Sequence, residues 1–310
     1  MCLVVIGCFL FPVLSCSNEP GNKPFDSLQY ITVLGVAQDG GFPHINAHDE
    51  WADLENGKRK RELVVSLGLI DKTEQQKWLF EATPDMPQQL YVLNKEENGN
   101  SIIDGVFLTH AHIGHYTGLM HFGREAMGAK DIPVYAMPRM NDYLETNGPW
   151  SQLVQLNNIT LKPMAQDSLI QLNPTLSVVP FRVPHRDEFS ETVGLKIMGP
   201  HRSALFIPDI NKWELWDRSI IEEVKAVDYA FLDATFFKEG EIPRPMSEVP
   251  HPFIEETVKL FENQPDSVKS KIIFIHFNHS NPALHSTDRL KDSLTNLGYH
   301  FAKTGDRYGL

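Results

Sequence analysis

The chain alternates between short apolar runs and segments in which apolar residues recur every three or four positions. Apolar runs of four to eight residues are typical of buried strands, and the longer spacing is typical of helices. The expected strands lie at residues 30–35, 63–70, 78–82, 102–109, 133–136, 159–163, 176–183, 192–198, 203–207, 229–232 and 271–277.

Helical patterns fall between these runs. A helix is expected to start in the turn at 83–87 and to run through Val92, and the others are expected at 115–122, 139–146, 213–224, 253–261 and 285–297. Strands come first in each half of the chain and then alternate with helices. This order fits two sheets packed face to face with helices outside, an α+β fold in the form of a four-layer αββα sandwich.

The N-terminal segment has a different character. Residues 2–14 are almost wholly apolar and end in Val13-Leu-Ser-Cys16. The run is shorter than the roughly 20 residues of a membrane span and matches a signal-peptide core. We therefore expect a signal peptide at 1–15, a polar tether at 16–28 and one domain at 29–310.

The end of the apolar run resembles a bacterial lipoprotein processing site. On this interpretation the protein is exported and is held at a membrane only through a lipid on Cys16, on the periplasmic side or the outer surface. No Lys or Arg precedes the apolar run, as a signal peptide normally requires. An ordinary secretory signal, or a misassigned start, therefore stays open.

Composition narrows the chemistry of the body of the protein. With 310 residues, 42% of them hydrophobic, the chain can bury a large core, and its net charge of −12 gives no general attraction to nucleic acid. Its three cysteines, Cys2, Cys8 and Cys16, all lie in the N-terminal segment. Any metal bound by the domain must therefore be held by His, Asp and Glu.

The segment most typical of a metal site is Thr109-His-Ala-His-Ile-Gly-His115. Side chains two apart on a strand share a face, so the end of the strand 102–109 is expected to point His110 and His112 the same way. The start of the next helix is expected to bring His115 beside them. Neutral imidazoles suit an ion such as Zn²⁺. The alternative is a loop with three surface histidines, or one ligand with two bystanders.

Further ligands are expected at the ends of later strands, because loops at one edge of a sheet can share an ion. The candidates are His185, Asp209, His276 and His279. Each has another interpretation: His185 as a surface residue, Asp209 as a helix N-cap, and one of the last two as a residue that orients a ligand. His251 precedes a predicted helix and stays undecided.

These histidines and Asp209 together resemble the metallo-β-lactamase-fold superfamily, whose pattern is His-x-His-x-Asp-His followed by a later His, Asp and His. Other segments resemble its pyrroloquinoline quinone biosynthesis protein B branch: 35–43, 82–89, 232–237 and 276–282. The resemblance implies a first metal on His110, His112 and His185, and a second on His115 and His276, with Asp209 bridging.

One residue departs from the superfamily pattern. The aspartate that normally precedes the last histidine of the motif is Gly114 here, so the second ion lacks a carboxylate ligand. We therefore expect one tightly held ion, zinc or alternatively iron, and a second that is weak or absent. Four residues are candidates to compensate: Asp39, Asp85, His251 and His279.

Three functions follow as hypotheses. The first is a hydrolase in which a metal-activated water attacks an ester, amide or phosphodiester bond of a small-molecule substrate. Asp209 would steer the hydroxide, and His251 or His279 would protonate the leaving group. The branch resemblance implies the second, an iron-dependent oxygenase acting on a quinone precursor. The third is a non-catalytic surface binding module with a degenerate metal site. The sequence leaves the substrate and the oligomeric state open.

Overall fold

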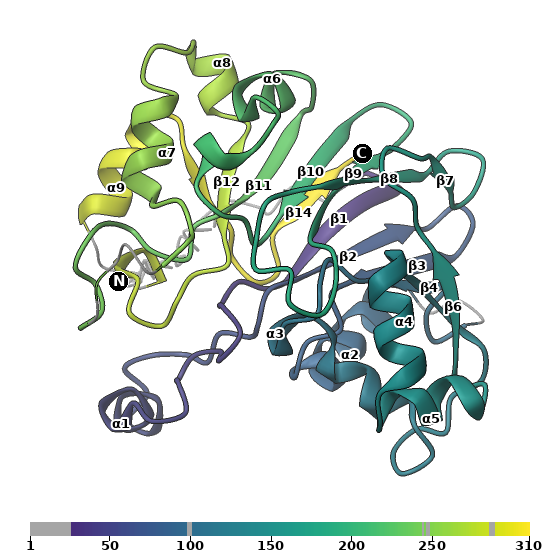
Figure 1. Ribbon diagram of the computed structural model, residues 1–310. Helices are drawn as coiled ribbons and strands as arrows, with labels where there is room; N and C mark the ends of the chain where they lie inside the picture. The colour runs from purple at the N-terminus through teal and green to yellow at the C-terminus, as the bar shows by residue number, and fades with distance from the viewer. Residues whose placement is uncertain (1–25, 98–100, 244, 246–248, 285–288) are drawn as a thin grey trace, which may run out of the picture.

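The computed structural model describes residues 26–97, 101–243, 245, 249–284 and 289–310 (Figure 1). The predicted signal peptide, Cys16 and most of the predicted tether lie outside the described residues. No described helix is long and apolar enough to cross a membrane.

Two seven-stranded mixed sheets form the centre of the molecule. The first has the order β14-β1-β2-β3-β4-β5-β6, and the second has the order β13-β12-β11-β10-β9-β8-β7. The strands of the first sheet are β1 (Gln29–Gly35), β2 (Ser66–Asp71), β3 (Gln76–Phe80), β4 (Gly105–Phe107), β5 (Ile132–Ala136), β6 (Ile159–Pro163) and β14 (Arg307–Gly309). Those of the second are β7 (Ile170–Gln171), β8 (Ser177–Arg182), β9 (Val193–Met198), β10 (Ser203–Ile207), β11 (Tyr229–Asp233), β12 (Ile272–Ile275) and β13 (His300–Phe301).

Helices cover the outer face of each sheet (Figure 1). The first sheet carries α2 (Met86–Glu96), α3 (Ile113–Tyr116), the 3-10 helix η1 (Thr117–Phe122), α4 (Pro138–Thr146) and α5 (Trp150–Gln155). The second carries η2 (Trp213–Leu215), α6 (Ile220–Lys225), α7 (Ile254–Leu260), α8 (Asp266–Lys269), η4 (Pro282–Leu284) and α9 (Arg289–Asn296). The helix α1 (His48–Glu55) has no buried residue and projects from the main body (Figure 1), which it contacts through Glu50 and His279.

Strand β1 shows why the apolar runs are continuous. Ile31 and Val33 pack into the core between the two sheets, whereas Tyr30 and Leu34 pack toward the helices outside the first sheet. Side chains alternate across a strand, so a strand buried on both faces needs apolar residues at successive positions. The predicted α+β, four-layer αββα sandwich is confirmed.

Several element boundaries differ from the predictions. The strand expected at 102–109 spans only Gly105–Phe107, so the predicted reason for the alignment of His110 and His112 is wrong. The helix expected at 213–224 is divided into η2 and α6, and Ser219 caps α6 by accepting a hydrogen bond from the backbone N–H of Glu222. The elements that the apolar pattern missed are short: α1, α5, α8, η4, β7, β13 and β14.

Parallel strand pairing determines where the polar loops gather. Strands β10, β11 and β12 are parallel neighbours, as are β3, β4 and β5. The carboxyl ends of parallel neighbours lie at one edge of a sheet. The residues that follow these strands therefore meet at the same end of the sandwich.

Candidate metal centre

The histidine loop after β4 is held by bonds to both sheets. The N–H of Leu108 donates to the carbonyl of Tyr135 in β5, and the carbonyl of Thr109 accepts from the N–H of Val193 in β9. The N–H of Ala111 donates to the Ser190 hydroxyl, 2.8 Å away. These bonds, rather than strand alternation, fix the direction of the histidines.

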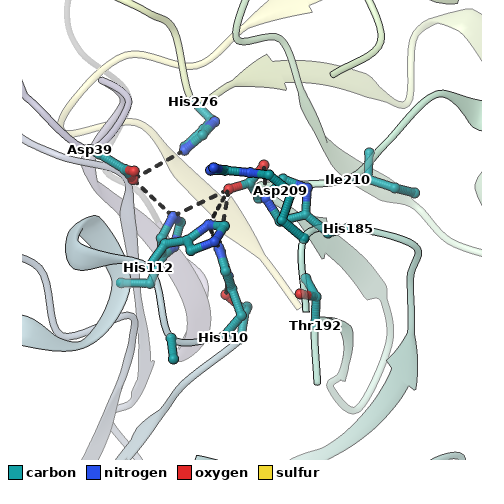
Figure 2. Close-up of polar contacts among 12 residues, drawn as sticks. Asp39, His110, His112, His185, Thr192, Asp209, Ile210 and His276 are labelled. Atoms are coloured by element: carbon teal, nitrogen blue, oxygen red, sulfur yellow. Dashed lines mark hydrogen bonds and ion pairs between the residues drawn. The ribbon is translucent and has the colours of Figure 1, made fainter. Parts of the chain in front are cut away.

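Four side chains form the first group of possible ligands: His110, His112, His185 and Asp209. One donor atom of each lies within 4.8 Å of the donor atoms of the others. His110 Nε2 is 3.2 Å from Asp209 Oδ2, and His185 Nε2 is 3.2 Å from Asp209 Oδ1. His112 presents its Nδ1 atom, 3.9 Å from Asp209 Oδ2. Figure 2 shows these side chains converging on Asp209.

A second group consists of Asp39, His115 and His276, and Figure 2 shows Asp39 and His276 close to Asp209. His115 Nε2 is 3.1 Å from Asp39 Oδ1 and 3.7 Å from Asp209 Oδ2. His276 Nε2 is 3.9 Å from Asp39 Oδ1. The carboxylate of Asp209 thus faces both groups and is placed to bridge two ions.

Five of the possible ligand atoms at this centre have no hydrogen-bond partner, whereas His110 Nε2 and His112 Nδ1 lie 2.8 Å apart and contact each other. Six of the ten unpaired buried side-chain N and O atoms found in the described residues belong to it, and five of these are possible ligand atoms of the two groups. Unpaired buried polar atoms are rare in folded proteins because their desolvation is not repaid. Imidazole nitrogens and carboxylate oxygens are ligands for zinc-type ions, so the residues present fit bound metal. The five donor atoms are Asp39 Oδ1, His115 Nε2, His185 Nε2, Asp209 Oδ1 and His276 Nε2.

The other ring nitrogen of each histidine is held by a neighbouring polar group. Such contacts fix the tautomer and the orientation of a metal-binding imidazole. The pairs are His110 Nδ1 with the Thr109 hydroxyl at 2.9 Å, His112 Nε2 with Glu188 at 3.3 Å, His115 Nδ1 with Glu81 at 3.3 Å, His185 Nδ1 with Asn211 at 3.1 Å and His276 Nδ1 with the Thr235 hydroxyl at 2.8 Å.

Asp233 and His251 lie beside the centre and are paired with each other. His251 Nδ1 is 2.9 Å from Asp233 Oδ2 and 3.1 Å from Asp209 Oδ1. Asp233 also accepts bonds from the N–H groups of Ile210 and Thr235 and from the Thr235 hydroxyl. Asp233 could join a third ligand group with Asp209, His251 and His276. Because its oxygens are already satisfied, we assign Asp233 to the support of His251.

Comparison with known protein families identifies the superfamily of this chain. The model of the beta-lactamase superfamily domain matches residues 76–277, which include the histidine loop, His185, Asp209 and His276. The chain belongs to the β-lactamase superfamily. Within it, the chain resembles the pyrroloquinoline quinone biosynthesis branch. Coenzyme PQQ synthesis protein B of Xanthomonas axonopodis pv. citri is 26% identical over 308 residues, which cover 89% of this chain and 98% of the relative.

Solved structures show the same fold. Zn²⁺-bound PqqB from Methylobacterium extorquens superimposes with a TM-score of 0.74 at 18% identity, over 91% of this chain and 100% of that one. A diphosphatase from the PhnP family superimposes with a TM-score of 0.59 at 22% identity, over 90% of this chain and 96% of that one. Both have the metallo-β-lactamase fold that the sequence predicts.

In this superfamily member the structure brings together most of the predicted site residues. His110, His112, His115, His185, Asp209 and His276 all lie in the two groups described above, and His251 contacts Asp209. Two of the predicted alternatives do not fit: His185 and Asp209 are buried, and the residue that caps η2 is Lys212. The roles of these residues in catalysis stay predictions.

His279 and Asp85 lie outside all three ligand groups. His279 Nδ1 is 2.8 Å from Glu50, and its ring stacks on that of His44. Asp85 accepts a hydrogen bond from the N–H of Val64 and pairs with Arg61. Neither residue is therefore placed to replace the missing carboxylate at position 114.

Sequence reasoning missed the residues that hold the ligands. Glu81 is fully buried after β3, and Thr235 and Asn211 follow strands β11 and β10. A polar residue within four positions of a strand end is the one signal that could have found them. That signal is too common in any sequence to select three residues without the structure.

Electrostatics at the centre follow from buried carboxylates facing imidazoles. Burial raises the pKa of the Asp209 carboxyl, but His185 and His251 outweigh burial and hold it well below its usual value. Burial lowers the pKa of His251, yet the neighbouring Asp233 and Asp209 raise it to about 10. Burial raises the pKa of Asp39, but His115 and His276 outweigh burial and hold this pKa well below the usual value of an aspartate. These carboxylates are therefore ionised at neutral pH and attract cations.

A cavity of about 450 Å³ opens beside His251. Polar side chains at its wall are Gln38, His44, Arg186, Thr235, Asn278 and His279, and apolar ones are Phe236, Ile242, Pro243, Val249 and Pro250. Pockets of this size accept small molecules. The mixed lining suits a ligand with an anionic group and an apolar portion.

Proposed function

We propose that the protein is an exported, metal-dependent hydrolase that cleaves an ester, amide or phosphodiester bond in a small anionic substrate. The observation that carries the proposal is the position of Asp209: its carboxylate faces both groups of histidines, and the His251–Asp233 pair lies beside it at the wall of the cavity. Membership of the superfamily and the diphosphatase with the same fold support hydrolysis.

His110, His112 and His185 would hold the first ion. A bound zinc-type ion supplies a water of lowered pKa and polarises the substrate oxygen. Asp209 would accept a hydrogen bond from the attacking water, because its carboxylate lies within 4 Å of donor atoms in both groups. The Thr109, Glu188 and Asn211 contacts would keep the imidazoles in the neutral tautomer that binds metal.

His251 is the better placed of the two predicted proton donors. Its Nδ1–H donates to Asp233 Oδ2, which leaves the other nitrogen, Nε2, to face a substrate from a ring that lines the cavity. His279 also lines the cavity but pairs with Glu50 and contacts none of the ligand groups. His251 would therefore donate the proton to the leaving group, with Asp233 as its orienting residue.

The cavity supports an anionic substrate. Arg186 lies at its wall with its guanidinium 4.0 Å from Glu188, an exposed and weak pair. A substrate phosphate or carboxylate can displace that contact and gain a charge-assisted hydrogen bond. The apolar residues of the cavity lining would hold the rest of the substrate.

The test is activity on aryl phosphodiesters and aryl esters before and after removal of metal. We expect activity to disappear with a chelator, to return with Zn²⁺, and to be lost in His110→Ala. His251→Ala should reduce kcat by about 10²- to 10⁴-fold on substrates with poor leaving groups and by much less on nitrophenyl substrates, which need no proton donor. Full activity in the chelated protein would overturn the proposal.

An iron-dependent oxygenase is the second candidate, favoured by the full-length likeness to proteins named for PQQ synthesis. His and carboxylate ligands with open positions also suit non-haem Fe(II). Two measurements on protein purified from its own host distinguish the oxygenase from the hydrolase: elemental analysis for the metal, and an assay of oxygen uptake. Iron with oxygen consumption would favour the oxygenase, and zinc with hydrolysis would exclude it.

A further inference from the structure

The space beside Gly114 is already filled by another residue. A Cβ atom built on Gly114 would lie 2.1 Å from Asp39 Oδ1, 2.7 Å from Asp39 Cα and 2.8 Å from Asp39 Cγ. Real Cβ atoms essentially never approach other atoms so closely. Any side chain at position 114 would therefore collide with the body of Asp39, and only glycine fits there.

The carboxylate of Asp39 occupies the space that a side chain at position 114 would enter. Its Oδ1 atom is buried without a hydrogen-bond partner, as are His115 Nε2 and His276 Nε2. The three atoms form one group of possible ligands. Two imidazoles and one carboxylate are a complete set of protein ligands for a catalytic ion of the zinc type.

The loop that carries Asp39 is tied to the loop that carries His276. The N–H of Phe277 donates to the carbonyl of Val36, and the N–H of Gln38 donates to the carbonyl of Phe277, both at 2.8 Å. Asp39 directly follows Gln38, and His276 directly precedes Phe277, so these two backbone bonds hold Asp39 and His276 close together. His276 itself has φ of 67°, a conformation that non-glycine residues rarely adopt and that tends to persist at functional sites.

We propose that Asp39 is the carboxylate ligand of a second metal ion, bound with His115 and His276, and that Gly114 is required because it leaves room for Asp39. The superfamily's aspartate is thus replaced by one from a loop about 75 residues earlier in the chain. The protein binds two ions per chain, and Asp209 bridges them. This inference rests on the proposed metal-dependent function.

The experiment counts zinc ions per chain in the full-length protein after removal of metal and titration with Zn²⁺. Wild type should bind two. Asp39→Asn, which keeps the size of the side chain, should bind one, or should bind the second more than about 100-fold more weakly, since loss of a supporting contact alone costs 10- to 100-fold. Gly114→Ala removes no ligand, yet it should also bind only one because the new methyl group displaces Asp39.

Two matched variants serve as controls. Ile113→Ala changes the exposed neighbour of Gly114. Glu50→Gln removes the carboxylate that pairs with His279, and Glu50 belongs to no ligand group. Both should keep two ions. Circular dichroism of the metal-free variants checks that each is folded, and Asp39→Asn supplies the answer if Gly114→Ala does not fold.

The outcomes separate this inference from the proposed function. Equal zinc binding by wild type and Asp39→Asn would overturn the role of Asp39, while loss of zinc in His110→Ala would still support the hydrolase. Wild type that binds no zinc and hydrolyses substrates without metal would overturn both. Loss of one ion in Asp39→Asn and in Gly114→Ala, but in neither control, would support the inference.

Discussion

Single residues behind the ligands determine how well the centre holds metal. Glu81 is fully buried, contacts His115 Nδ1 at 3.3 Å and accepts a hydrogen bond from the Thr109 hydroxyl, which in turn contacts His110. One carboxylate thus contacts His115 directly and His110 through Thr109, the proposed ligands of two different ions.

Glu81→Gln should therefore weaken metal binding. The neutral amide keeps the size of the side chain but removes the charge that makes His115 a stronger ligand, so affinity should fall by about 10- to 100-fold. Competition with a chromophoric chelator measures the change. The matched variant is Glu188→Gln, whose carboxylate is 48% exposed and lies 3.3 Å from His112. If both variants bind metal equally well, the burial of Glu81 has no importance for the site.

At the scale of elements, loops between predicted strands carry the chemistry, and helices fix these loops. The 3-10 helix η1 follows the histidine loop and packs directly on the loop after β3. The N–H of Gly118 donates to the carbonyl of Ala82, and the N–H of Ala82 donates to the carbonyl of His115. Close packing of η1 thus sets the position of His115.

Gly118→Ala should destabilise the protein. A Cβ at this position would lie 2.1 Å from the carbonyl oxygen of Thr83 and 2.8 Å from the Cβ of Met86. Forcing η1 away from this loop should cost about 1–3 kcal/mol in the free energy of unfolding. Chemical denaturation of the metal-free protein measures it. Gly148→Ala, where a Cβ meets nothing within 4 Å, is the control. An unchanged unfolding midpoint in Gly118→Ala would contradict the predicted packing.

On the scale of the whole molecule, the centre joins the two sheets. Asp39 and His110 come from loops of the first sheet, and His185, Asp209 and His276 come from loops of the second. Metal binding should therefore stabilise the entire sandwich. At zinc concentrations about 1,000 times the dissociation constant, the free energy of unfolding should rise by about 4 kcal/mol. Thermal denaturation with and without chelator tests this, and equal midpoints would contradict it.

The same centre makes metal binding depend on pH. Burial lowers the pKa of His115, but Glu81 and Asp39 outweigh burial and raise it well above the usual value, and the pKa of His276 is also raised. A raised pKa keeps the proton on these imidazoles up to a higher pH, and a metal ion that binds them must displace it. Zinc affinity should therefore increase between pH 6 and pH 8, with proton release measurable by calorimetry in two buffers. Affinity that does not change over this range would contradict the prediction.

The N-terminal segment supplies a separate prediction about location. We propose that Cys16 is lipidated after removal of residues 1–15. In a bacterial host, Cys16→Ala should move the protein from the membrane fraction to the soluble fraction, whereas Cys8→Ala, a change within the apolar run, should leave it in place. Immunoblotting of the fractions decides. Wild type found only in the soluble fraction would contradict lipidation.

The sequence by itself determined the layers of the fold and six possible metal ligands. Apolar runs report burial on both faces of a strand, and three histidines within six residues are a local pattern, so both can be read along the chain. The sequence also showed that position 114 lacks a carboxylate, and it left Asp39 as one of four candidates to compensate.

Only the tertiary structure places Asp39 in one ligand group with His115 and His276, and leaves Asp85 and His279 outside every such group. Asp39, His115 and His276 are far apart in the sequence, and their meeting depends on backbone bonds between the loops after β1 and β12. The support of the imidazoles by Glu81, Asn211 and Thr235 depends likewise on the pairing of parallel strands. Contacts between distant segments arise from the way whole sheets pack. They leave no local pattern in the sequence, so neither hydrophobic periodicity nor a motif predicts them.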